Sequence, residues 1–294
     1  MIELNVKKSS AEKRAYLRDA IARKGKTILA AGAHNGLSAR LVEESGFEAV
    51  WSSSFEISAS AALPDASLLS MSEYLTAAKQ MNDAVSIPVI ADCDTGFGNN
   101  LNAVYAVQQF EAAGIAAVCF EDKQFPKMNS FVGAGQHLEQ IDTFARKIKV
   151  AKEAQTTKDF MIIARTEALV VGCDVSEALK RAHAYADAGA DAILIHSKAK
   201  TPDEVLDFIS CWQDRLPVVV VPTTYYSLTV EEANAAGVKL MIFANHGMRA
   251  MISGSKEVLS KICVSGSSES VQSEIATVQD IFQIQRLPEW LEHE

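Results

Sequence analysis

The chain has 294 residues, 48% of them hydrophobic and 22% charged, and a formal net charge of -9. This length fits either two average domains or one large α/β barrel, and the negative charge argues against nucleic acid or an anionic membrane as a partner. No run approaches the roughly 18 consecutive apolar residues of a membrane helix, and residues 1–25 lack the apolar segment of a secretory signal.

The cysteines are odd in number and far apart, without the spacing of a zinc or redox motif. This pattern favours reduced, mostly buried thiols in a cytoplasmic protein. The five are Cys93, Cys119, Cys173, Cys211 and Cys263.

In chain order, a charged helix is expected first, over residues 10–24, where it would cap one end of the fold. Short apolar runs follow, each suited to a strand buried on both faces. They span 27–32, 49–54, 87–94, 116–122, 160–167, 192–197, 217–223 and 239–246. Amphipathic stretches between them predict helices, several of which end at a glycine such as Gly114 or Gly189. Further helices are expected near 247–262 and 270–286, around a Ser-rich joint at 264–271.

Eight strands alternating with helices predict an α/β fold, a (β/α)8 TIM-type barrel in a single domain over 1–294. Residues 1–26 would hold the N-terminal helix, 27–246 the barrel, and 247–294 a C-terminal helical extension. A doubly wound open sheet is the alternative, but no GxGxxG turn follows the first strand.

Polar residues collect at the carboxyl ends of the strands, where such barrels hold their active residues. In "DCDTGFGN", Asp92 and Asp94 stand two apart, so both would project to one face of an extended backbone. Gly96 and Gly98 would let the chain turn closely around whatever they hold. These carboxylates suit Mg²⁺, with Glu121 at the next strand end completing the shell through water. A helix-capping and a turn aspartate are the structural alternative.

Arg165 and His196 end neighbouring strands. Arginine offers a planar fork for carboxylate or phosphoryl oxygens, and histidine can donate to a developing oxyanion. A rim pair between Arg165 and Glu167, together with a hydrogen-bonded core histidine, is the structural alternative.

Six segments resemble the phosphoenolpyruvate mutase/isocitrate lyase superfamily, and the likeness covers nearly the whole chain. They are "AGAHNGLSARLVEESGFEAVWSSSFEISAS", "DCDTGFGN", "FEDKQFPKMNS", "ARTEAL", "ADAILIHSK" and "VVPTTYY". The Lys-Lys/Arg-Cys-Gly-His loop of the lyases is absent. In its place "KMNS" is similar to the Lys-x-Asn-Ser signature of the mutases, whereas the related phosphonopyruvate hydrolases typically have threonine where Asn129 stands. The segment "FEISASAALPDASLLSMS" reads closer to the hydrolases.

The resemblance implies that Asp92 binds Mg²⁺ while Asp94 and Glu121 hold its waters. Ser53 and Phe55 would bind the carboxylate and carbonyl end of the substrate. Beside them, Ser54 stands where many relatives have glycine and would also contact the substrate.

The remaining implied residues close over the reacting centre. Asp65 would be the acidic residue there, a gating loop would contain Lys127, Asn129 and Ser130, and the phosphoryl group would meet Arg165 and His196. A phosphoryl group that moves from an enol oxygen to carbon passes through a loose, metaphosphate-like species. The loop would supply charge and neutral donors while it excludes water.

The implied function is Mg²⁺-dependent interconversion of phosphoenolpyruvate and 3-phosphonopyruvate by an isomerase. A phosphonopyruvate hydrolase is the alternative; a carbon–carbon bond lyase of the superfamily and a non-catalytic binding barrel are weaker ones. The resemblance also implies a homotetramer with swapped C-terminal helices. Because the equilibrium favours the enol phosphate, biosynthesis would need a downstream enzyme such as a phosphonopyruvate decarboxylase.

Overall fold

A closed barrel of parallel strands forms the centre of the computed structural model, which describes residues 8–133 and 136–292. Each strand pairs with its chain neighbours, and the first pairs with the last, Ile28 opposite Leu240. The eight predicted strands are therefore confirmed, and the open doubly wound alternative is wrong. The strands are β1 (Ile28–Ala33), β2 (Ala49–Ser52), β3 (Val89–Asp92), β4 (Ala117–Glu121), β5 (Met161–Thr166), β6 (Ala192–Ile195), β7 (Val218–Val220) and β8 (Val238–Phe243).

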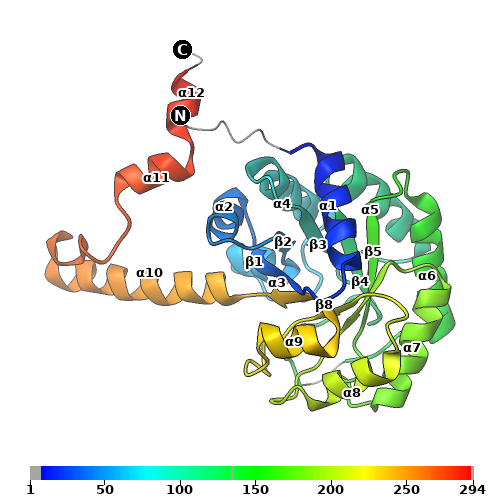
Figure 1. Ribbon diagram of the computed structural model, residues 1–294. Coiled ribbons are helices and arrows are strands. Elements are labelled where there is room, and N and C mark those ends of the chain that lie inside the picture. The colour runs from blue at the N-terminus through cyan, green and yellow to red at the C-terminus, as the bar shows by residue number, and fades with distance from the viewer. Residues whose placement is uncertain (1–7, 134–135, 293–294) are drawn as a thin grey trace. The chain divides into compact units, whose positions relative to one another are not determined.

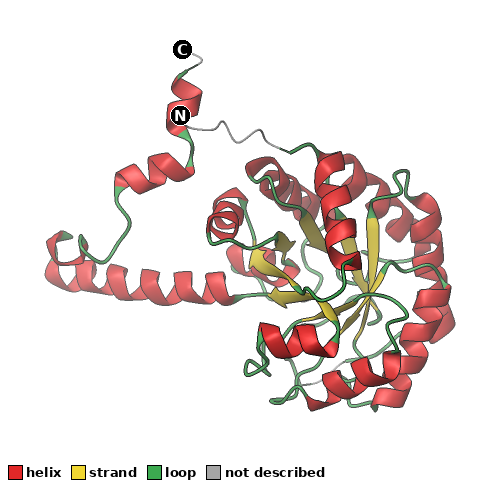
Figure 2. Ribbon diagram, viewed as in Figure 1, coloured by secondary structure: helices red, strands yellow, loops and turns green. Residues whose placement is uncertain are grey.

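Helices surround this ring of strands (Figure 1; Figure 2). The predicted glycine ends are confirmed at Gly46, Gly114, Gly189 and Gly237, which all have positive φ. A residue without a Cβ adopts that conformation at low steric cost. The helices are α1 (Ser10–Ala22), α2 (Gly36–Glu44), α3 (Ser54–Ser60), α4 (Met71–Ala84), α5 (Asn100–Ala112), α6 (Ile141–Ala154), α7 (Val175–Asp187), α8 (Asp203–Trp212) and α9 (Val230–Ala236).

The barrel interior is packed with side chains at the end where the strands begin. Leu17 and Ile21 of α1 are buried in one cluster with Ile28 and with other strand residues such as Ala117. Full burial of a side chain of this size contributes about 1.5–3 kcal/mol. The expected N-terminal helix thus closes this end and leaves the opposite, carboxyl end of the strands for a site.

A second compact unit begins at His246, directly after the first unit ends at Asn245. It contains α10 (His246–Ser265), a 3₁₀ turn (Glu269–Val271), α11 (Val278–Ile284) and α12 (Leu287–Leu291). The helix expected over 270–286 is wrong in extent. Thr277 accepts from the Asp280 amide in a capping box, which starts a new helix at residue 278.

All five cysteines are free. The expectation that most are buried is wrong: only Cys93 and Cys119 are buried, Cys173 is half-buried, and Cys211 and Cys263 are exposed. Among the described residues, no helix is both long enough and apolar enough to cross a bilayer.

Candidate active site

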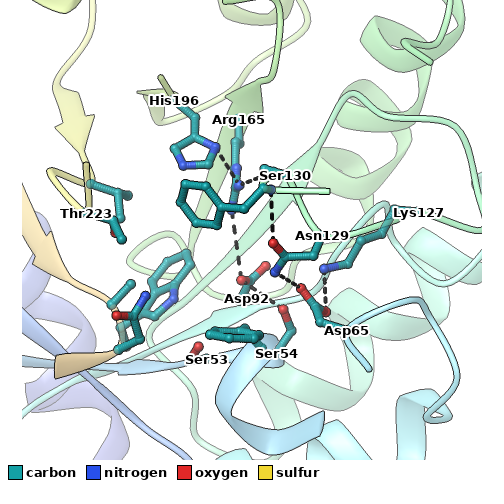
Figure 3. Close-up of a pocket in the computed structure, with 16 residues that line it drawn as sticks. Ser53, Ser54, Asp65, Asp92, Lys127, Asn129, Ser130, Arg165, His196 and Thr223 are labelled. Carbon is teal, nitrogen blue, oxygen red and sulfur yellow. Dashed lines mark hydrogen bonds and ion pairs between the residues drawn. The ribbon is translucent and has the colours of Figure 1, made fainter. Parts of the chain in front are cut away.

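A pocket opens at the carboxyl end of the strands (Figure 3). Ten predicted site residues line it, whereas Asp94 and Glu121 do not. The ten are Ser53, Ser54, Phe55, Asp65, Asp92, Lys127, Asn129, Ser130, Arg165 and His196.

Asp92 is the last residue of β3, and its carboxylate lies at the pocket floor between two other polar groups. Ser54 Oγ donates to Asp92 Oδ2 over 3.0 Å, and Arg165 Nη1 is 4.0 Å from the same oxygen. The extended backbone that would put Asp92 and Asp94 on one face ends here, because Asp94 has φ +49°. The expectation that the two carboxylates share a face of an extended strand is therefore wrong. Asp94 instead borders a neighbouring cavity.

Buried carboxylate oxygens behind the pocket lack hydrogen-bond donors. Asp94 Oδ1 and Glu121 Oε1 accept no hydrogen bond from the described residues, although Lys127 Nζ pairs with the first at 3.2 Å and Lys123 Nζ with the second at 3.5 Å. Burial raises the pKa of Asp92, and it raises the pKa of Asp94 to about 7. Such oxygens fit a hard cation or the water molecules around it.

No three histidine, cysteine, aspartate or glutamate side chains in the described part of the chain converge into a complete metal cage. Asp65 and Asp92 are the described carboxylates that line the pocket, and both Asp65 oxygens are taken up by Lys127 and Asn129, so Asp92 is the candidate for the direct ligand of a hard cation.

Glu167, the residue directly after β5, holds the side chains of Arg165 and His196 together. Its Oε1 accepts from Arg165 Nε over 2.5 Å and lies 2.7 Å from His196 Nδ1. Burial alone would raise the pKa of Glu167, but the charge of Arg165 and the contact with His196 outweigh it and lower that pKa well below the usual range. The rim pair considered as a structural alternative is thus present. It orients both side chains, which also line the pocket.

The protonation of His196 follows from its burial, which lowers its pKa and favours the neutral imidazole. Arg165 Nη2 lies 2.8 Å from His196 Nδ1, and an arginine can only donate. When Nδ1 accepts this bond, Nε2 carries the proton and can donate to a ligand. The other tautomer donates from Nδ1 to Glu167 instead.

The gating loop, residues 124–131, lies against the pocket and is held by Asp65 (Figure 3). Lys127 Nζ is 2.5 Å from Asp65 Oδ1, and Asn129 Nδ2 donates to Asp65 Oδ2 over 2.8 Å. The Asn129 backbone amide also donates to the Asp65 carbonyl oxygen, over 3.0 Å. Ser130 Oγ donates to Glu167 Oε2 over 2.6 Å. The loop is therefore closed in this structure, fastened on both sides of the pocket.

Lys127 carries its charge deep into this closed site. Burial by itself would lower the pKa of Lys127, but the carboxylates of Asp94, Glu121 and Asp65 outweigh it and raise that pKa well above the ordinary value. The ammonium is therefore charged, and it forms ion pairs with Asp65 and Asp94 beside the pocket.

Some residues of this site were not assigned a role from the sequence. Phe131 lines the pocket and packs edge-on to His196 at a ring distance of 6.2 Å. Lys123 is buried beneath the gating loop. Glu167 was considered only as a rim partner of Arg165. The position of Glu167 two residues after Arg165, at a strand end, is the one local signal that could have identified it.

Comparison with known proteins agrees with this geometry. The family model for phosphoenolpyruvate phosphomutase matches residues 17–263. A phosphoenolpyruvate phosphomutase from Streptomyces platensis subsp. rosaceus has a similar crystal structure, with a TM-score of 0.94, 48% identity, and coverage of 96% of this chain and 98% of that one.

Two sequence relatives bear on the chemistry. A phosphonopyruvate hydrolase of Variovorax sp. (strain Pal2) is 46% identical over 89% of this chain and 91% of its own length. A phosphoenolpyruvate phosphomutase of Tetrahymena pyriformis is 42% identical over 94% of this chain and 92% of its own. A crystal structure of a phosphonopyruvate hydrolase in complex with oxalate and Mg²⁺ has a TM-score of 0.90 and 43% identity, covering 95% of this chain and 97% of that one.

Proposed function

The chain belongs to the phosphoenolpyruvate phosphomutase family, and from this premise we propose that it is a phosphoenolpyruvate mutase. It would interconvert phosphoenolpyruvate and 3-phosphonopyruvate by moving one phosphoryl group between an oxygen and a carbon of the same pyruvyl skeleton. The observation that carries this proposal is Asn129, which presents a carboxamide to the closed pocket while Asp65 accepts from its Nδ2. An amide can donate to a transferring phosphoryl group but does not attack it.

The proposed cofactor is Mg²⁺, held directly by Asp92 and through water by Asp94 and Glu121. When bound, it would stabilise the enolate of pyruvate. The buried oxygens of Asp94 and Glu121 that accept no hydrogen bond from the described residues support this assignment, as does the Mg²⁺ named in the related hydrolase structure. Ser53, Ser54 and Phe55 would surround the pyruvyl end, since all three line the pocket beside Asp92.

At the phosphoryl end, the charges of Arg165 and Lys127 would offset those of a loose, metaphosphate-like transition state. His196 would donate from Nε2 while its Nδ1 accepts from Arg165, which Glu167 holds in place. Asn129 would donate at the same centre, and Ser130 would secure the closed loop through its bond to Glu167. With the loop closed, water is kept from an intermediate that would otherwise yield phosphate. Opening and closing of the loop would admit the substrate.

A phosphonopyruvate hydrolase is the second candidate, and the 46% identical relative favours it. The lyases have a weaker case, because none of the described residues that line the pocket is a cysteine, and burial raises the pKa of Cys93 well above its ordinary value. One coupled assay separates mutase from hydrolase. With phosphonopyruvate and Mg²⁺, NADH consumption by lactate dehydrogenase that requires added pyruvate kinase and ADP reports phosphoenolpyruvate. Consumption without the kinase reports pyruvate and supports the hydrolase.

A homotetramer that swaps C-terminal helices is proposed as the working assembly, in a cytoplasmic setting that suits five free cysteines. Its support is the apolar surface of the second unit, because exposed apolar patches mark contact sites. Light scattering should give about four times the 31.8 kDa chain mass, and a monomer would contradict the assembly. The exposed apolar side chains of the second unit include Met251, Ile252, Leu259, Val264, Val278 and Trp290.

A decarboxylase that consumes phosphonopyruvate is the proposed functional partner.

A further inference from the structure

Lys123 lies at the base of the gating loop, two residues after β4 ends at Glu121. Its side chain is almost fully buried, with 1% of the residue exposed, yet it does not line the pocket. The backbone around it is fixed: Lys123 forms an isolated antiparallel bridge with Leu138, and the Gln124 amide donates to the His137 carbonyl over 2.9 Å. The loop therefore leaves the barrel at Lys123 and returns beside it at Leu138.

The ammonium of Lys123 joins the loop to the barrel. On the loop side it donates to the Met128 carbonyl oxygen over 2.8 Å and to Ser130 Oγ over 2.9 Å. On the barrel side it lies 3.5 Å from Glu121 Oε1 and 3.4 Å from Glu167 Oε2. These two carboxylates end β4 and follow β5, so they remain in place when the loop moves.

Opening of the loop would remove both loop acceptors from a charged group that stays buried between two acids. A buried ammonium strongly favours the state in which its protons have acceptors. Each hydrogen bond from a charged donor shifts such an equilibrium roughly tenfold or more. Lys127 differs in kind, because it belongs to the loop itself and pairs with Asp65.

We propose that Lys123 is a positioning residue, a latch that holds the gating loop closed from below and thereby keeps water from the transferring phosphoryl group. The second half of this statement rests on the proposed mutase function, whereas the first half does not. Through the latch, the enzyme would favour return of the phosphoryl group to the pyruvyl skeleton over its capture by water.

The test compares Lys123→Met with Lys13→Met. Lys13 is a matched control, because it is also 1% exposed and donates to a backbone carbonyl, that of Asn82, over 2.7 Å at the other end of the barrel. Amide hydrogen exchange of peptides spanning residues 124–133 is measured without ligand. Lys123→Met should speed exchange there roughly tenfold or more, and Lys13→Met should leave it unchanged. Lys123→Gln, which keeps a neutral donor, should be intermediate and serves if the methionine variant fails to fold.

The second readout is the ratio of phosphate to phosphoenolpyruvate formed from phosphonopyruvate. Lys123→Met should raise this ratio, Lys123→Arg should restore it in part, and Lys13→Met should match the wild type. Unchanged loop exchange in a folded Lys123 variant would overturn the latch. Faster exchange with an unaltered ratio would overturn the claim that the latch keeps water from the phosphoryl group. If the wild type makes phosphate alone, the mutase proposal fails, and the exchange result still decides whether Lys123 holds the loop.

Discussion

Asp65 and Lys127 form a buried ion pair, 2.5 Å between Oδ1 and Nζ, that links the segment after α3 to the gating loop. The side chains are 3% and 5% exposed, and Asp65 also accepts from Asn129. Two of the three gating-loop residues assigned to the site, Lys127 and Asn129, thus depend on this one carboxylate. Asp65 therefore both closes the loop and aligns the groups that would meet the phosphoryl oxygens.

Removal of the Asp65 carboxylate should lower the free energy of unfolding. Asp65→Ala leaves Lys127 charged and buried with Asp94 as its nearest remaining acid. We expect the free energy of unfolding to fall by about 3–5 kcal/mol, as for other broken buried pairs. Urea denaturation followed by circular dichroism measures it. Asp83→Ala, which breaks the exposed pair with Lys79, is the control and should cost about 0.5 kcal/mol or less. Equal losses in both variants would contradict the role of burial.

Asn129→Ala should lower mutase turnover roughly 10²-fold or more, comparable to the loss of one oxyanion donor. Steady-state kinetics with phosphonopyruvate measure this change. Asn129→Thr introduces a hydroxyl at the same place and should shift products toward phosphate. Wild-type rates in the alanine variant would refute the role assigned to the carboxamide.

Mg²⁺ affinity should divide the three acids into one direct ligand and two that act through water. In titration calorimetry, Asp92→Asn should abolish measurable Mg²⁺ binding. Asp94→Asn and Glu121→Gln should weaken it about 10–100-fold, the effect expected of outer partners. Asp83→Asn, on the surface, controls for charge. Equal loss in all three site variants would instead indicate direct ligation by each.

Glu111 should make stability depend on pH at the end of the barrel remote from the pocket. Burial would raise its pKa, but bonds from Thr157 and the Thr156 and Thr157 amides outweigh it and lower the pKa below 4.5. A depressed folded-state pKa stabilises the protein above the unfolded value, and this contribution is lost as pH falls through the folded pKa. Glu111→Gln should therefore cost about 1–3 kcal/mol at pH 7 and progressively less below about pH 4.5. Urea denaturation across this range checks it, and a pH-independent difference would contradict it.

The barrel could be predicted because strand burial on both faces and glycine at helix ends are local signals. The meeting of Ser130 with Glu167, or of Asp65 with Asn129, could not, because these contacts join segments 37 and 64 residues apart. Their formation depends on the backbone path of the closed loop.

The error at Asp94 has a similar origin. Two-residue spacing places side chains on one face only while the backbone stays extended. The backbone stops being extended at Asp94, whose positive φ lies inside the turn over residues 94–96. Lys123 and Lys127 likewise stand four apart in one short segment, yet one is under the loop and the other faces the pocket. Composition alone could not separate them.

The most direct test of the central claim is phosphorus NMR of the protein with Mg²⁺ and phosphonopyruvate. We predict that a phosphoenolpyruvate signal grows as phosphonopyruvate declines, without a matching phosphate signal, and that a chelator abolishes it. Inorganic phosphate formed in step with pyruvate, and no phosphoenolpyruvate at any time, would contradict the mutase and establish the hydrolase.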